Sequence, residues 1–186
     1  MSLVELIAQA DERGLAVSGL ACLDRCVPLL GGDDEVLRPL WASLAADAAP
    51  ADWTERLEQT RGKLDAAAGD ADEAVVLAHR MLVTAPAERS AAGLREWADG
   101  CSLAALRIHR LLDGAGAGGT GPADECREGA AEGLSPLLAA ELRRQITVLE
   151  LLSAHGPAGL RGALEVSTEG RRVLRAAVSR RSRRDG

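Results

Sequence analysis

The chain has 186 residues, enough for one domain with a hydrophobic core, and its formal net charge is −6 at pH 7. Phe and Tyr are absent, so the core must consist of Leu, Val and Ala, of which Ala and Leu are the best helix formers. The four cysteines are too few for a disulfide scaffold, and no apolar run approaches the roughly 18 residues that a membrane-spanning helix needs.

Helix signals recur along the chain, and no segment alternates polar and apolar residues over a useful length. Polar residues followed three positions later by Glu mark helix starts, and glycines mark helix ends. The pattern predicts helices near 3–12, 15–30, 34–46, 52–67, 71–84, 87–113, 123–132, 135–154 and 158–180. The expected fold is all-α, a single-domain bundle of about 7–9 helices with no β-sheet, occupying residues 1–180.

Two cysteines stand four residues apart in the second predicted helix, within "LACLDRCVPLL" at 20–30. Cys22 and Cys26 therefore share one side of that helix, whereas Asp24 and Arg25 are expected to point elsewhere. A structural zinc site needs four ligands, and the other Cys and His residues are isolated singles. We expect both cysteines to pack as small buried residues, and Pro28 to kink or end the helix.

Three residues are candidates for a small-molecule site. His79 lies beside the apolar positions of the helix predicted at 71–84, and Trp97 begins the apolar stripe of the helix predicted at 87–113. His109 lies at the flank of that stripe. No nucleophile, base or carboxylate partner is fixed beside these residues by spacing, so the pattern favours structural roles over catalysis.

A glycine-rich segment at 114–122, "GAGAGGTGP", separates the front helices from the rear ones. It contains the pattern G-x-G-x-x-G twice, but the dinucleotide-binding fingerprint requires a strand before it, and a helix is predicted there instead. We therefore expect no cofactor and interpret the segment as a mobile loop.

The rear helices have two different apolar faces. The helix at 135–154 carries a leucine stripe that is interrupted by one polar residue, Gln145. The last helix has a narrow face of small residues that would let another helix approach closely, formed by Ala163, Ser167, Gly170, Leu174 and Ala177.

The C-terminus is the strongest charge feature. Seven arginines occur among the last sixteen residues: Arg171, Arg172, Arg175, Arg180, Arg181, Arg183 and Arg184. They can contact an acidic partner, the acidic body of the chain or a nucleic acid backbone, or remain solvated. No aromatic residues are interleaved for base stacking, which disfavours nucleic acid. Residues 181–186 are expected to form a basic disordered tail.

These observations favour a non-catalytic bacterial protein that acts through protein–protein interaction or regulation. The bias of 21 arginines to one lysine is typical of a GC-rich genome. The alternatives are a small-molecule-binding protein or enzyme with a site near His79, Trp97 and His109, and nucleic acid contact through the arginine tail. We expect a cytoplasmic protein with no metal, cofactor or membrane segment. The protein partner is unknown, and a homodimer is one alternative.

Overall fold

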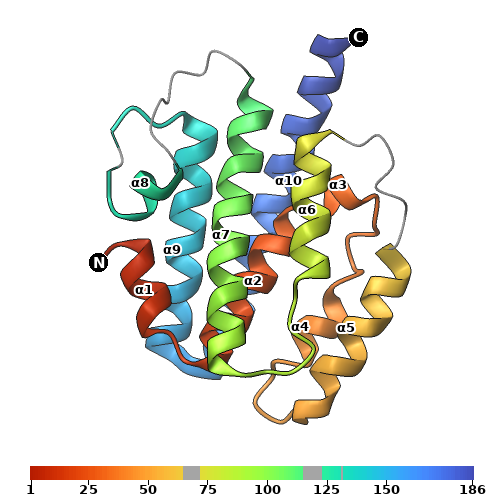
Figure 1. The fold of residues 1–186 in the computed structure, drawn as a ribbon, viewed down its shortest axis with the longest axis vertical. Helices are drawn as coiled ribbons and strands as arrows, with labels where there is room; N and C mark the ends of the chain where they lie inside the picture. The colour runs from red at the N-terminus through yellow and green to blue at the C-terminus, as the bar shows by residue number, and fades with distance from the viewer. Residues whose placement is uncertain (65–71, 115–122, 131) are drawn as a thin grey trace.

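The computed structural model describes residues 1–64, 72–114, 123–130 and 132–186, and these residues contain α-helices and one 3₁₀ turn but no strand (Figure 1). This confirms the all-α fold class. The elements are α1 (Leu3–Gln9), α2 (Glu12–Arg25), α3 (Val27–Leu30), α4 (Arg38–Ala42), α5 (Pro50–Leu64), α6 (Glu73–Val83), α7 (Ala91–Asp113), α8 (Ala123–Arg127), α9 (Pro136–His155), η1 (Gly156–Gly159) and α10 (Leu160–Asp185). Apart from Gly114, the glycine-rich segment 114–122 lies outside the described residues.

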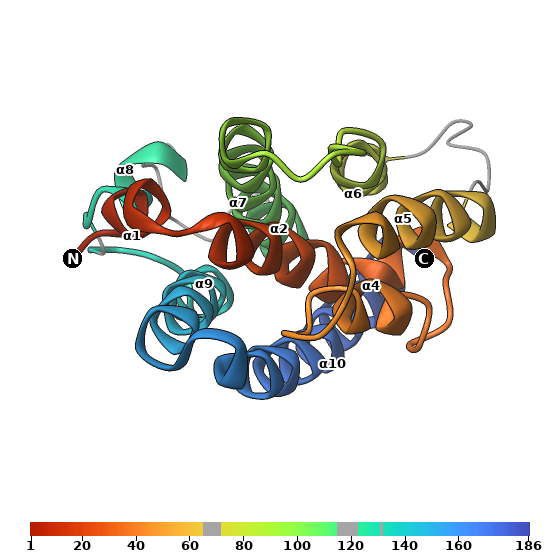
Figure 2. The same ribbon diagram turned by 90° about the horizontal axis from the view of Figure 1, so that it is seen from below.

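Helix α2 is the centre of the fold. Figure 2 shows it between a layer that contains α6 and α7 and a layer that contains α9 and α10. Twelve of its 14 residues are buried, so α2 is covered on every side and its polar residues must find partners inside the protein. Its N-terminus is capped by Asp11, whose side chain accepts a hydrogen bond from the backbone N–H of Gly14 at 2.7 Å.

Pro28 explains why the helix predicted at 15–30 is two helices. Helix α2 ends at Arg25, Cys26 is its C-cap, and α3 follows with Pro28 in its first turn. Proline lacks the N–H that would continue the ladder, and it clashes with the preceding turn. The expected break at this proline is confirmed.

The last helix extends further than predicted. Helix α10 continues to Asp185, whereas the sequence pattern ends it near 180 and leaves 181–186 disordered. Two arginines tie this end to the rest of the chain: Arg181 lies 3.4 Å from the carboxylate of Asp72, and Arg184 donates to the carbonyl of Leu112 at 3.1 Å. These long-range contacts have no sequence signal, which is why the prediction ended the helix early.

The small-residue face of α10 is confirmed. All five of its members are buried in the structure: Ala163, Ser167, Gly170, Leu174 and Ala177. A Cβ at Gly170 would lie only 2.9 Å from the Cγ of Arg25. The glycine therefore leaves room for the stem of this α2 arginine between the two helices.

Candidate functional site

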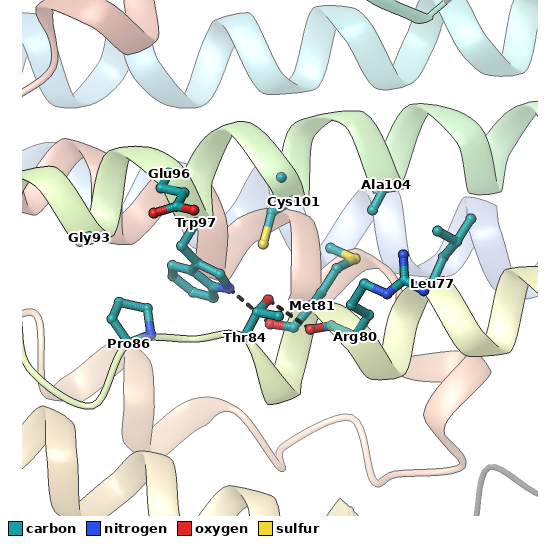
Figure 3. Close-up of a pocket in the computed structure, with 11 residues that line it drawn as sticks. Leu77, Arg80, Met81, Thr84, Pro86, Gly93, Glu96, Trp97, Cys101 and Ala104 are labelled. Carbon is teal, nitrogen blue, oxygen red and sulfur yellow. Dashed lines mark hydrogen bonds between the residues drawn. The ribbon is translucent and has the colours of Figure 1, made fainter.

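An open groove of about 450 Å³ lies between α6 and α7 (Figure 3). The two helices are consecutive in the chain and lie side by side on one face of the molecule (Figures 1 and 2). The groove is mostly apolar, and its floor is formed by Leu77, Met81, Trp97, Cys101 and Ala104.

The floor of the groove is held rigidly. The indole Nε1 of Trp97 donates to the carbonyl of Met81 at 2.9 Å, which joins α7 to α6. The Trp97 ring also packs edge-on against Trp53, with 5.9 Å between the ring centroids. Beneath the ring, a Cβ at Gly19 would lie 2.6 Å from the indole, so α2 supports it at close range. The groove is therefore preformed.

Two charged side chains stand on the rim of the groove. Arg80 extends from α6 toward Leu77, and Glu96 stands on α7 beside Trp97, toward the opposite end of the groove (Figure 3). Both are exposed, and neither forms an ion pair with another described residue. The groove thus has a positive charge, Arg80, toward one end and a negative charge, Glu96, toward the other.

The three residues proposed from sequence as a small-molecule site are separated in the fold. Trp97 lies in the floor of the groove. His79 is half-buried on α6 and does not line the groove, whereas His109 is fully buried and contacts α9. The groove therefore contains only Trp97 of the three side chains.

A network of buried polar side chains lies deep in the bundle. The guanidinium of Arg25 donates two hydrogen bonds to the carboxylate of Glu141, at 2.9 and 2.7 Å, and both side chains are fully buried. Gln145 donates to Glu141 at 2.9 Å and accepts from the hydroxyl of Ser102 at 2.6 Å. The network therefore joins α2, α7 and α9.

His109 borders this network. Its Nδ1 donates to the carbonyl of Ala105 at 2.7 Å, which leaves Nε2 3.5 Å from a carboxylate oxygen of Glu141. Neither this Nε2 nor the Nη1 of Arg25 has a hydrogen-bond partner among the described residues. A buried nitrogen without a hydrogen-bond partner is costly, so these two atoms are points at which the network lowers the stability of the core.

Burial and charge act in opposite directions on the carboxyl of Glu141. Burial alone would raise its pKa, but the Arg25 charge and the hydrogen bonds from Arg25 and Gln145 outweigh burial and lower the pKa to about 2. Burial lowers the pKa of His109, against the opposing effect of Glu141. At neutral pH the site therefore holds a charged Arg25–Glu141 pair beside a neutral imidazole.

His109 and Glu141 should each make the protein less stable as the pH falls. Burial disfavours protonation of His109 in the folded chain. Below pH 6.5, the ordinary pKa of histidine, the unfolded chain therefore binds more protons than the folded chain. The lowered pKa of Glu141 adds a further loss between 4.5 and about 2. Chemical denaturation at a series of pH values should show a smaller slope between 6.5 and 4.5 for His109→Gln.

The matched control for this pH series is His155→Gln, which removes an exposed histidine at the end of α9. This variant should keep the wild-type slope. An unchanged slope in His109→Gln would show that His109 titrates alike in the folded and unfolded chains.

The cysteines of α2 pack in the core, as the sequence predicts. Cys22 and Cys26 are both buried, and neither forms a disulfide. Burial raises the pKa of Cys22 to about 12 and that of Cys26 well above its ordinary value, so both thiols stay protonated at neutral pH. Among the described residues, no group of three or more His, Cys, Asp or Glu could hold a metal ion.

The C-terminal arginines divide between internal contacts and solvent. Arg171 pairs with the buried Asp24, whose other oxygen accepts from Trp41 Nε1 at 2.7 Å, and Arg175 pairs with Asp34. Arg181 and Arg184 contact the chain as described above. The remaining members of the set, Arg172, Arg180 and Arg183, are exposed. Much of the predicted basic surface is therefore used to hold α10 on the acidic body.

Sequence reasoning missed the buried charges. Asp24 and Arg25 were expected to point away from the core, but both are buried because α2 is covered on all sides. The available signal was Gln145, the one polar residue in the leucine stripe of α9. Glu141 precedes it by one helical turn and lies on the same face.

The fold and the groove define a class of protein, an all-α bundle with a preformed apolar groove between two neighbouring helices. No helix among the described residues has both the length and the apolar character needed to cross a membrane. Comparison with known proteins does not assign the chain to a family, because no protein-family model, curated protein or solved structure matches it.

Proposed function

We propose that this protein is a non-catalytic helical module that binds an amphipathic helix of a protein partner in the groove between α6 and α7. The observation that carries the proposal is the open apolar floor around Trp97 and Met81, which the hydrogen bond between these two residues holds in place. An apolar groove bordered by two helices can accept the apolar face of a third helix, with its side chains spaced at i, i+3, i+4 and i+7.

The charges on the rim specify the orientation of a bound helix. Arg80 stands at one end and Glu96 at the other, so a partner helix is favoured when its acidic side chain lies at the Arg80 end. A basic side chain of the partner would then lie near Glu96. Such rim charges contribute mainly to orientation and association rate, whereas the apolar floor supplies the affinity.

The geometry favours a protein partner over a small molecule. A small-molecule site usually contains polar groups that point into the pocket and orient the ligand. Here the Nε1 of Trp97 and the hydroxyl of Thr84 already donate to carbonyls of α6. Neither His79 nor His109 lines the groove. The reduced Cys22 and Cys26 suit a reducing compartment, and we propose the cytoplasm.

Photocrosslinking from inside the groove tests this function. Gly100 lines the groove and is exposed, and a Cβ at this position would meet no atom within 4 Å, so the photoreactive residue benzoylphenylalanine is introduced there. Irradiation in a lysate of the host should give discrete protein adducts, whose attachment site maps to an amphipathic helix. The readout is mass spectrometry of the crosslinked peptides.

Two controls make this experiment decisive. The same photoreactive residue at Arg161, an exposed position on α10 in the opposite layer, should give none of these adducts. Ala104→Arg, which fills the groove, should remove the adducts formed at position 100. Adducts that are equal at both positions, or that persist in Ala104→Arg, would contradict a docking role for the groove.

A further inference from the structure

We propose that the face formed by α6 and α7 pairs with the same face of a second copy of this chain, related by a two-fold axis, so that α6 of each copy is the amphipathic helix that docks. This inference rests on the proposed docking function and names its partner. The argument begins from the positions of the two rim charges, which stand at opposite ends of one groove (Figure 3).

A two-fold axis through the middle of the groove exchanges its two ends. Arg80 of one copy is thereby placed over Glu96 of the other, and the reverse contact forms at the other end. Each dimer gains two attractive contacts between side chains that have no ion-pair partner among the described residues of the single chain. A parallel arrangement would instead bring like charges together, so the charge pattern is self-complementary only in the antiparallel pairing.

The apolar surface continues outside the groove on α6. Val76 and Val83 are 38% and 55% exposed, and they stand seven residues apart on the outer face of this helix. Arg80 lies between them and the groove. In the described part of the chain, four large hydrophobic residues are exposed, and these valines are two of them. A second copy seated on α6 and α7 would cover both.

Helix α6 has 11 residues and is therefore only about 16 Å long, which makes the contact small. Interfaces at the low end of the size range are transient, so we expect a dissociation constant on the order of micromolar.

Sedimentation velocity over a concentration series from about 1 to about 500 µM should show a reversible monomer–dimer equilibrium for the wild type. Arg80→Glu and Glu96→Arg should each weaken dimerisation by about tenfold or more, because each homodimer then contains two contacts between like charges. Both side chains are exposed, so the variants should fold, which circular dichroism checks.

The decisive measurement is an equimolar mixture of the two single variants. In the mixed dimer, the glutamate introduced at position 80 of one copy faces the arginine introduced at position 96 of the other. The native Glu96 of the first copy faces the native Arg80 of the second, so both contacts are again attractive. The mixture should recover the wild-type dissociation constant, and so should the double variant Arg80→Glu with Glu96→Arg.

The outcomes separate the two proposals. A wild type that stays monomeric over the whole series, with adducts of another protein at position 100, would overturn self-pairing and keep the docking function. A dimer that is insensitive to both single variants, or a mixture that fails to recover affinity, would also overturn this pairing. Absence of both a dimer and adducts would overturn both proposals.

Discussion

Replacing Glu141 with leucine should lower the free energy of unfolding by about 3–5 kcal/mol, the cost of leaving a buried charge without its partner. Arg25 would keep its charge inside the bundle, where Glu141 is the only ion-pair partner of its guanidinium among the described residues. Gln145 would also lose an acceptor, although Ser102 still bonds it. Urea denaturation of the wild type and the variant measures the difference.

A second variant separates the stranded charge from simple loss of packing. Arg25→Met with Glu141→Leu removes both charges and should recover most of the lost stability, since a buried pair replaced by apolar residues is often neutral or stabilising. Glu150→Leu, at an exposed position of α9, is the control and should change stability by less than about 0.5 kcal/mol. A double variant as unstable as Glu141→Leu would contradict this account.

Gly159→Ala should destabilise the protein by roughly 1–3 kcal/mol, because it overpacks the turn between α9 and α10. A Cβ at Gly159 would meet the carbonyl oxygen of Leu151, with its carbonyl carbon 2.8 Å away. Gly159 has φ −71° and ψ −14°, which any residue can adopt, so only the close approach to the α9 backbone requires glycine here. A backbone atom cannot rotate away as a side chain can.

Gly62→Ala is the matched control for this prediction. Gly62 lies inside α5, and a Cβ there would meet nothing within 4 Å. Alanine is the better helix former, so this variant should raise stability by up to about 1 kcal/mol. Thermal and urea denaturation should therefore shift in opposite directions for the two glycines. A neutral Gly159→Ala would mean that η1 moves away from α9 without cost.

The sequence by itself determined the fold class and most helix faces. Leu and Ala dominate, aromatic residues are few, and helix caps recur, so local propensity already specifies helices. The small-residue face around Gly170 also follows from helical spacing alone, because a helix with one apolar stripe buries that stripe. Pro28 fixes the end of α2 through its own covalent structure.

Only the tertiary structure decided which polar residues are inside and where the groove lies. Arg25 and Glu141 are 116 positions apart, and each looks like an ordinary surface charge until α2 is enclosed by its neighbours. Trp97 had a predictable place on an apolar stripe, but its groove exists only because α6 packs beside α7. Helical periodicity reports the faces of one helix. The partner that each face meets is set by long-range packing, which leaves no periodic signal in the chain.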